Sequence, residues 1–241
     1  MQVQGHRGSK GTHPENTLAA FMEAELSGAT GIELDLQVTQ EGVVVIHHDY
    51  FTKGSNKLIR DCPLKSLYSN DKESGISTLE ELFLMLLKIR SRLFINLELK
   101  RDSGHPNWSI DPALFADKVI SLVKRFNLEN VVYYSSFDLV ILEQIHIRAP
   151  KARLSYIVEA KIFDHLYPEE LFKQIRGVGA TIIAPEYTAL NKELVEALRS
   201  AGLFIIAWTV NEPDQWQKLV DMGVDGIITD YPRRLVEFLG K

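Results

Sequence analysis

The sequence reads Ile32-Glu33-Leu34-Asp35-Leu36 and, after a turn, Val43-Val44-Val45-Ile46-His47-His48-Asp49. Side chains alternate between the two faces of a β-strand, so Glu33 and Asp35 point to one side and their apolar neighbours to the other. Two adjacent carboxylates repel each other unless a positive group lies between them, and a divalent cation with oxygen ligands is the usual solution. The stretch therefore predicts a metal site. A solvent-facing strand edge with acidic residues is the alternative.

Strands and helices alternate along the rest of the chain, and unbroken Val and Ile runs are typical of parallel strands buried on both faces. After strands that begin near Val3 and Ile32, we predict strands over residues 93–99, 131–135, 153–158, 181–184, 203–210 and 226–229. The pattern Ser77-Thr78-Leu79-Glu80 predicts a reciprocally capped helix start. Counting eight strand and helix pairs, we predict a single-domain (β/α)₈ TIM barrel over residues 1–241, with a short insertion after the second strand. An open doubly wound sheet is the structural alternative.

Composition is ordinary for a globular enzyme, with 45% hydrophobic and 24% charged residues among 241. The net charge of -5 argues against a nucleic-acid partner, which would favour a basic surplus. The single Cys62 excludes an intrachain disulfide. The chain shows no secretory signal pattern, and its apolar runs at 82–87 and 203–210 are shorter than the roughly 20 residues of a membrane span. We expect a soluble cytoplasmic protein, and leave a homo-oligomer open.

The carboxyl ends of the strands form the active site of such a barrel, and the polar residues fall there. Glu33 and Asp35 lie late in the second strand, and Glu98 and Lys100 end the third with the same two-residue spacing. An isolated pair such as Glu98 and Lys100 could be a surface ion pair of little consequence. Together, the three acids predict a site for Mg²⁺ or Ca²⁺.

Basic residues follow the same strand ends. His6 and Arg7 end the first strand, and one of the adjacent residues His47 and His48 must face the site while the other faces away. Arg7 and Lys100 offer the charge that binds a phosphate, which predicts a phosphate-bearing substrate. Two histidines on either side of it could divide the proton transfers.

These residues belong to motifs that resemble the glycerophosphodiester phosphodiesterase family along essentially the whole chain. The motifs are His6-Arg7-Gly8, Pro14-Glu15-Asn16-Thr17, Glu33-Leu34-Asp35, His48-Asp49, Glu98-Leu99-Lys100, Ser136-Phe137, Trp208-Thr209-Val210-Asn211 and Gly226-Ile227-Ile228-Thr229-Asp230-Tyr231-Pro232.

The resemblance implies a barrel that hydrolyses glycerophosphodiesters, such as glycerophosphocholine or glycerophosphoethanolamine, to glycerol 3-phosphate and an alcohol. It implies that His6 and His48, rather than His47, are the catalytic acid and base. It further implies that the carboxylates hold a divalent metal and that the cations contact the phosphate. The metal ligands would be Glu33, Asp35 and Glu98, and the substrate contacts would be Arg7, Glu15, Lys100 and Trp208. The role of Glu15 near the site is left open. Trp208 is a candidate for the wall of the substrate cleft.

The chain departs from the family pattern at two points. Residues 50–54 lack an Asp-Arg pair common in relatives, and Ser77 replaces a frequent proline. Both positions lie in the region of a polar segment, 50–75, that we expect to act as a covering loop, so they concern substrate preference.

Other functions stay open on the residues alone. Another barrel phosphodiesterase or phospholipase-like enzyme would use the same groups. A Mg²⁺-dependent lyase that stabilises an enolate would also use three carboxylates, but it leaves the phosphate-binding pair without a task. A catalytically silent barrel that binds phosphodiesters is the non-enzymatic alternative.

Overall fold

The computed structural model describes residues 1–52, 56–68, 76–163, 165 and 168–241. Within these residues, parallel strands form a closed ring, because β1 pairs with β10 on one side and with β2 on the other. In ring order the strands are β1 (Gln2–Gly5), β2 (Gly31–Val38), β5 (Phe94–Leu99), β6 (Val132–Ser136), β7 (Leu154–Val158), β8 (Ile182–Pro185), β9 (Phe204–Ala207) and β10 (Gly226–Thr229). The closed ring confirms the predicted barrel and excludes the open doubly wound sheet.

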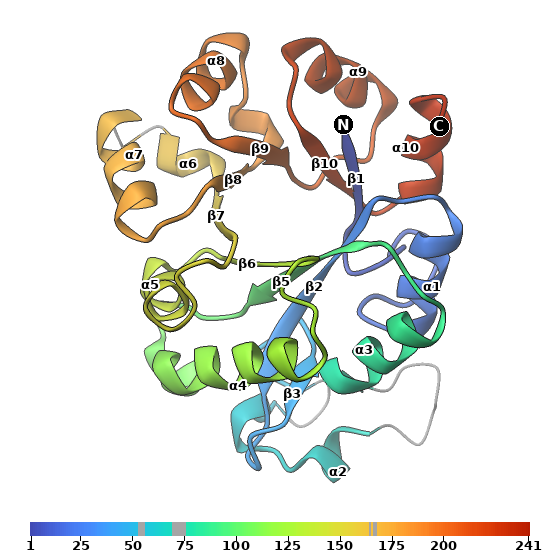
Figure 1. The fold of residues 1–241 in the computed structure, drawn as a ribbon, viewed down its shortest axis with the longest axis vertical. Helices are drawn as coiled ribbons and strands as arrows, with labels where there is room; N and C mark the ends of the chain where they lie inside the picture. The colour runs from blue at the N-terminus through green and yellow to red at the C-terminus, as the bar shows by residue number, and fades with distance from the viewer. Residues whose placement is uncertain (53–55, 69–75, 164, 166–167) are drawn as a thin grey trace.

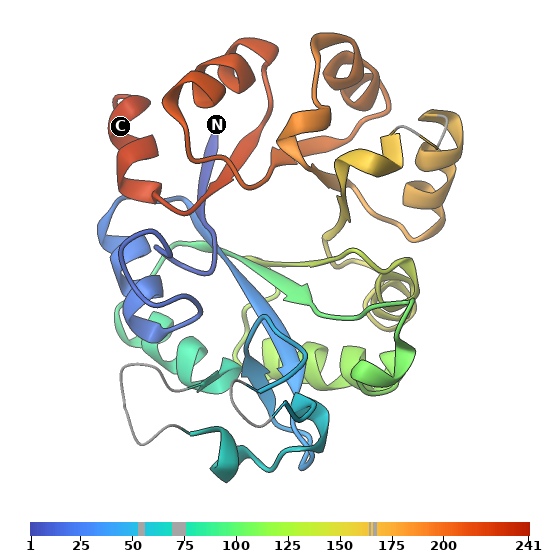
Figure 2. The ribbon, with the colours of Figure 1, turned by 180° about the vertical axis from the view of Figure 1, so that it is seen from behind.

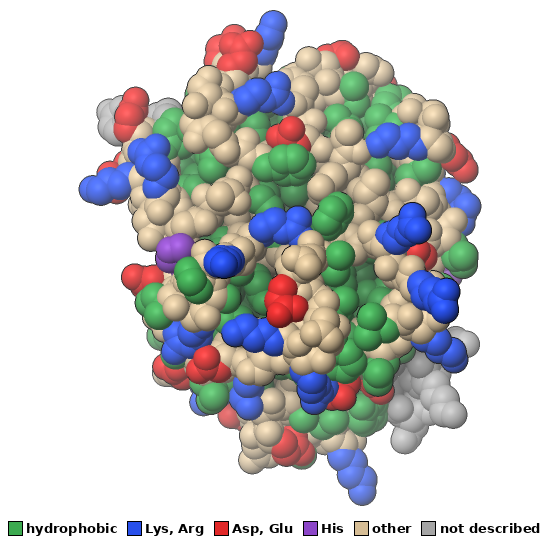
Figure 3. Space-filling model, viewed as in Figure 1, with side chains coloured by type: hydrophobic (Ala, Val, Ile, Leu, Met, Phe, Trp, Pro, Cys, Tyr) green, Lys and Arg blue, Asp and Glu red, His purple; other side chains and the backbone are tan. Residues whose placement is uncertain are grey.

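Helices surround the ring of strands, as Figure 1 shows. They are α1 (Leu18–Leu26), α3 (Leu79–Lys88), α4 (Pro112–Arg125), α5 (Leu139–Arg148), α6 (Ala160–Phe163), α7 (Pro168–Gly177), α8 (Lys192–Ser200), α9 (Pro213–Met222) and α10 (Pro232–Phe238), with 3₁₀ turns at Pro106–Trp108 and Tyr187–Ala189. None of the described helices is long and apolar enough to cross a membrane. On the face drawn in Figure 3, Lys and Arg side chains are interspersed with Asp and Glu side chains.

The predicted insertion follows β2 and lies at the lower edge of the ring in Figures 1 and 2. It contains β3 (Val44–Ile46), which runs antiparallel to β2, a 3₁₀ turn at Ile59–Asp61, α2 (Leu64–Leu67) and β4 (Ser77–Thr78). The insertion has a small core of its own, formed by Val45, Ile59, Cys62 and Leu67. Residues 53–55 and 69–75 of the predicted covering loop lie outside the described residues.

Two layers of apolar side chains stabilise the barrel. Between the strands and the helices, Phe21, Phe83 and Trp216 are almost completely buried, and each stabilises the fold by about 1.5–3 kcal/mol or somewhat more for the larger rings. A separate cluster consists of Tyr133, Ile182, Ile206 and Ile228. Because successive strand residues face opposite sides, this second cluster fills the inside of the barrel and forms the floor of the site.

Most predicted strand bounds lie within one residue of the observed ones, and two differences have a structural explanation. The reciprocal cap joins Thr78 to Glu81, one residue later than predicted, because this pair has the same spacing and residue types as Ser77 and Glu80, and the helix begins only after Thr78, the last residue paired with β3. Thr78 accepts from the backbone of Glu81 at 3.1 Å and donates its own backbone N–H to the Glu81 carboxylate at 2.7 Å. The strand predicted over 203–210 ends at Ala207, where the chain turns into the wall of the site.

The turn after β1 depends on Gly8. Its φ of +81° lies in the left-handed region, and a Cβ there would lie 2.6 Å from the backbone of Ala20 in α1. The close approach is fixed by a hydrogen bond from the backbone N–H of Ser9 to the carbonyl of Ala20, at 2.9 Å. The turn thereby holds the preceding residues, His6 and Arg7, at the mouth of the barrel.

Gly8→Ala should therefore destabilise the protein far more than Gly202→Ala, although both glycines have a positive φ and only Gly202 has no heavy atom near the new methyl group. We expect a loss of about 1 kcal/mol at Gly202 from backbone strain alone. At Gly8 we expect at least about 3 kcal/mol, because the clash with α1 adds to the strain. Urea denaturation of both variants measures the difference, and equal losses would show that the turn has room to relax.

Candidate active site

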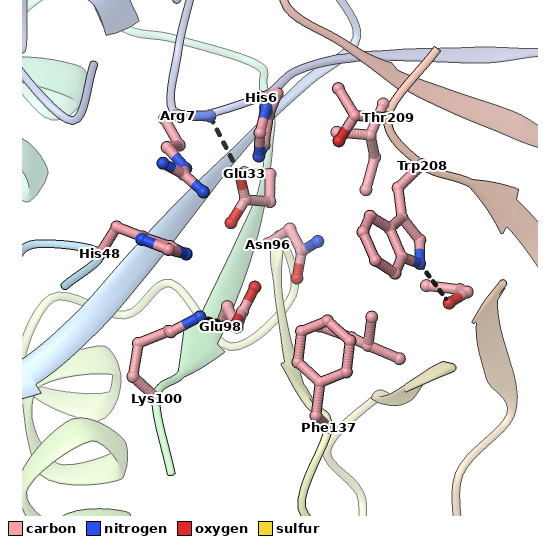
Figure 4. Close-up of a pocket in the computed structure, with 13 residues that line it drawn as sticks. His6, Arg7, Glu33, His48, Asn96, Glu98, Lys100, Phe137, Trp208 and Thr209 are labelled. Carbon is pink, nitrogen blue, oxygen red and sulfur yellow. Dashed lines mark hydrogen bonds and ion pairs between the residues drawn. The ribbon is translucent and has the colours of Figure 1, made fainter. Parts of the chain in front are cut away.

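A cavity of about 90 Å³ lies at the carboxyl ends of the strands. In Figure 4, charged side chains occupy one side of the cavity, and the rings of Phe137 and Trp208 occupy the other. Its lining includes residues from both ends of the chain. They are His6, Arg7, Glu33, His48, Asn96, Glu98, Lys100, Phe137, Ile157, Ala184, Trp208, Thr209 and Ile228.

Three carboxylates meet beside this cavity. One oxygen from each of Glu33, Asp35 and Glu98 lies within 4.8 Å of the others. Asp35 on β2 is paired with Glu98 on β5 in the parallel register, which places their carboxylates side by side. The three residues are only 3%, 1% and 8% exposed, and β2 is flanked on both sides by other strands. The alternative of an acidic, solvent-facing strand edge is therefore wrong.

Two cations neutralise part of this negative charge. Lys100 Nζ lies 2.8 Å from Glu98 Oε1 and 3.6 Å from Asp35 Oδ1. Arg7 Nε lies 3.1 Å from the other oxygen of Asp35. Burial opposes the charge of Lys100, but Glu98 and Asp35 outweigh it and raise the pKa of the lysine. Burial likewise opposes ionisation of Asp35, yet Lys100 and Arg7 keep its pKa below the usual value.

The pKa of Glu33 is shifted in the opposite direction from that of Asp35. Burial, together with repulsion from Asp35 and Glu98, raises the pKa of Glu33 well above its usual value. The backbone N–H of Arg7 donates to Glu33 Oε2 at 2.9 Å, while Glu33 Oε1 is buried without a hydrogen-bond partner among the described residues. A buried carboxylate oxygen without a partner, next to two more carboxylates, fits a divalent cation that prefers oxygen ligands.

His6 is held by residues at the other end of the chain. Its Nδ1 lies 2.6 Å from Asp230 Oδ1, and Asn211 donates to the second Asp230 oxygen at 2.7 Å. Burial would raise the pKa of Asp230, but its hydrogen bonds with His6 and Asn211 lower the pKa below the usual value. Since an ionised carboxylate only accepts, Nδ1 of His6 donates to it, and Nε2 is left for the cavity.

His48 enters the cavity from the insertion, and His47 does not line it. Asp49 Oδ1 lies 2.8 Å from His48 Nδ1, and about a third of the His48 side chain is exposed. Gln37 on β2 fixes the backbone here, because its side-chain amide donates to the carbonyls of His47 at 3.2 Å and Asp49 at 2.5 Å. The two histidines thus differ in how far their aspartate partners are exposed to solvent. The Asp230 side chain, which contacts His6, is 17% exposed, and the Asp49 side chain, which contacts His48, is 54% exposed.

The loop between β1 and α1 places Arg7 in a left-handed conformation, with a φ of 51°. Arg7 Nη1 donates to both oxygens of Glu15 at 3.0 Å, and Lys10 lies 3.3 Å from the same carboxylate. Asn16, also left-handed with a φ of 60°, donates to Asp35 at 2.8 Å. The loop therefore supplies Asp35 with both a charge and a hydrogen bond.

Two aromatic residues form the far wall of the cavity. Trp208 Nε1 donates to the carbonyl of Ala184 at 2.8 Å, which fixes the plane of the indole. The Phe137 ring packs edge-on against it, with 5.5 Å between the ring centroids and 88° between the planes. This wall gives the cavity an apolar side that could contact the carbon skeleton of a substrate.

The structure brings most of the predicted site residues to the cavity. Asp35 lies behind the lining, in contact with Arg7 and Lys100, and Glu15 lies outside it, on Arg7. Sequence reasoning gave no role to Asn16, Asn96 and Asp230. Two of them carried a usable signal: Asn96 precedes Glu98 by two residues on the same strand face, and Asp230 directly follows β10 as His6 follows β1.

A model of the glycerophosphoryl diester phosphodiesterase family matches residues 6–234. A glycerophosphodiester phosphodiesterase of Bacillus altitudinis is 33% identical and covers 98% of this chain and 97% of its own. One of Caldanaerobacter subterraneus is 31% identical and covers 99% of this chain and 98% of its own. The structure of an Oleispira antarctica phosphodiesterase in complex with the product sn-glycerol-3-phosphate has a TM-score of 0.87 and 24% identity, and the match covers 100% of this chain and 97% of that one.

The raised pKa of Glu33 has a measurable effect on stability. In the unfolded chain the pKa of Glu33 is about 4.5, and below that pH the carboxyl group is protonated in both the folded and the unfolded state. As the pH rises above 4.5, the unfolded state loses this proton before the folded state does, so the folded state becomes less stable relative to the unfolded state. In the presence of a chelator, Glu33→Gln should therefore raise the free energy of unfolding at pH 8 by about 1 kcal/mol or more, and change it little at pH 4.

Glu15→Gln is the matched control with the opposite sign. Burial would raise the pKa of Glu15, but Arg7 and Lys10 lower it, so its stabilising effect is present above the unfolded pKa and is lost as the pH falls. This substitution should destabilise the protein at pH 8 more than at pH 4. Denaturant titrations at both pH values measure the two effects. An equal response of the two variants to pH would contradict the assigned charge pattern.

Proposed function

Because the chain belongs to the glycerophosphoryl diester phosphodiesterase family and is a phosphoric diester hydrolase, we propose that its substrates include glycerophosphocholine or glycerophosphoethanolamine. The products would be sn-glycerol 3-phosphate and the alcohol. The product in the Oleispira antarctica structure supports this reaction. We further infer that residues 1–241 act as one catalytic domain, since the family match and the barrel both extend along the chain.

The observation that carries the proposal is one small cavity lined by two histidines, two cationic side chains and two acids, with a third acid behind it. Phosphodiester hydrolysis can use each of these groups. Cations stabilise the charge on the phosphoryl oxygens, and titratable groups move protons at the attacking and leaving oxygens. An enolate-forming lyase would need no phosphate-binding pair.

Glu33, Asp35 and Glu98 would hold the divalent cation, Mg²⁺ or Ca²⁺. Their oxygens lie within 4.8 Å of one another, and the partnerless oxygen of Glu33 gives such an ion a ligand that no side chain already uses. When bound, the ion would supply positive charge to the phosphoryl oxygens and orient them.

Arg7 and Lys100 would contact the phosphate. Both line the cavity, and both keep contacts with Asp35, so each cation is held in place before substrate arrives. With all three acids ionised and both bases charged, the group carries a net charge of -1, which a divalent cation would convert to +1. The site would therefore attract an anionic diester only in its metal-loaded form.

His6 and His48 would perform the proton transfers. Asp230 orients His6, so that Nε2 can exchange a proton with an oxygen on the phosphorus. His48 would act on the opposite oxygen, and its greater exposure suits the exchange of that proton with solvent. The attacking oxygen is either that of water or that of the neighbouring glycerol hydroxyl; the two histidines serve both routes.

His6→Ala and His48→Ala should each lower the turnover of glycerophosphocholine by about 10²–10⁴-fold, because each removes a proton-transferring group. Release of glycerol 3-phosphate, measured with Mg²⁺, Ca²⁺ and Mn²⁺ in turn, reports the rate. His165→Ala removes an exposed histidine that does not line the cavity and should retain the wild-type rate. Near-normal turnover in either of the first two variants, once circular dichroism has shown them folded, would remove that histidine from the mechanism.

A further inference from the structure

A second cavity, of about 460 Å³, lies beside the catalytic one and shares Phe137 and Ile157 with it. The Phe137 ring stands between the two, with Lys100 Nζ 5.8 Å from its centroid. A molecule whose phosphate contacts Lys100 would therefore have the second cavity on the far side of this ring. The two cavities share this part of their walls at the mouth of the barrel.

A phosphodiester has a substituent on each side of its phosphorus, and the two adjoining cavities, of about 90 Å³ and about 460 Å³, offer a separate place for each substituent. Beyond the acids, the first cavity ends at Trp208, Thr209 and Ile228. This small end suits the glycerol, which is common to all glycerophosphodiesters. The larger cavity, on the side of β6 and β7, is left for the alcohol, which varies in size and charge.

The wall of the second cavity combines aromatic rings with an excess of negative charge. Tyr50, Phe137 and Tyr156 supply the rings, and burial raises the pKa of Tyr50 to about 12, so this phenol stays neutral.

The charged residues of the wall are three acids and two bases. Arg101 is paired with Asp138, and Lys161 Nζ lies 2.7 Å from Glu159. Asp102 is the acid without a Lys or Arg partner in this wall; it accepts from His105 Nδ1 at 2.9 Å and from the backbone of Gly104 at 2.8 Å.

We propose, on the basis of the proposed function, that the second cavity binds the alcohol part of the diester and favours an alcohol that carries a positively charged ammonium group. A cation gains from the faces of aromatic rings and from the excess of carboxylates. A neutral polyol gains neither. An anionic alcohol would be repelled by the net negative charge of the wall, which is that of Asp102 once the two ion pairs cancel. Arg101 does not reverse this preference, because Asp138 neutralises it.

The experiment compares kcat/KM for glycerophosphocholine with kcat/KM for glycerophosphoglycerol, whose alcohol is neutral. The wild-type ratio should exceed one. Glu159→Gln removes a negative charge from the wall and should lower the ratio about two- to five-fold, the range expected of a partly exposed charge pair. Lys161→Met frees Glu159 from its partner and should raise the ratio by a similar factor. Glu129→Gln, an exposed acid before β6 at the other end of the barrel, should leave the ratio unchanged.

The outcomes separate the two proposals. If both diesters are hydrolysed but the ratio does not respond to Glu159→Gln and Lys161→Met in opposite directions, the ammonium subsite is overturned while the hydrolase stands. If neither diester releases glycerol 3-phosphate, the proposed function fails, and the subsite fails with it. A ratio below one in the wild-type enzyme would also overturn the subsite.

Discussion

The burial of three carboxylates at one point is the constraint on which the rest of the site depends. Like charges held together in a barrel raise the free energy of the folded state unless cations and hydrogen bonds offset them. Asp35 forms ion pairs with Arg7 and Lys100 and accepts a hydrogen bond from the Asn16 amide. Glu33 accepts one hydrogen bond, from a backbone N–H. The negative charge of Asp35 is therefore almost fully balanced, whereas one oxygen of Glu33 has no hydrogen-bond partner among the described residues. A bound divalent ion would complete what the chain leaves incomplete, which is why metal binding and phosphate binding are coupled in our proposal.

Closure of the ring explains how such distant residues meet. Because β1 lies between β10 and β2, His6 reaches Asp230, 224 positions away, and its neighbour Arg7 reaches Glu33. The strands form a packed wall that fixes these distances, and the functional side chains extend from their ends. His48 comes from outside the ring, on an insertion whose backbone is hydrogen-bonded to Gln37 of β2. Fixed acids on one side and a more exposed histidine on the other suit a site that must hold a phosphate and admit different alcohols.

Periodicity predicted much of this arrangement. The two-residue spacing placed Glu33 and Asp35 on one face, and the rule that barrel sites lie at the carboxyl ends of strands brought His6, Arg7 and Glu98 to them. The contact of Asn16 with Asp35 depends on a left-handed backbone that no pattern in the sequence specifies. The local capping pattern fits both Ser77 with Glu80 and Thr78 with Glu81, so it did not choose between the two registers; the helix begins after Thr78, the last residue of β4 paired with β3. The second cavity could not be predicted either, since it needs the paths of several separate loops at once.

Anomalous diffraction from crystals soaked in Mn²⁺ tests most directly whether Glu33, Asp35 and Glu98 share one divalent ion. We predict a strong peak at this point, with an oxygen of each carboxylate within about 2.6 Å of the ion, and with Lys100 displaced to its side and still in contact with Glu98. If the metal-soaked crystals showed the ammonium of Lys100 between the acids, and peaks only at other places, the three carboxylates would form an ion-pair network and not a metal centre.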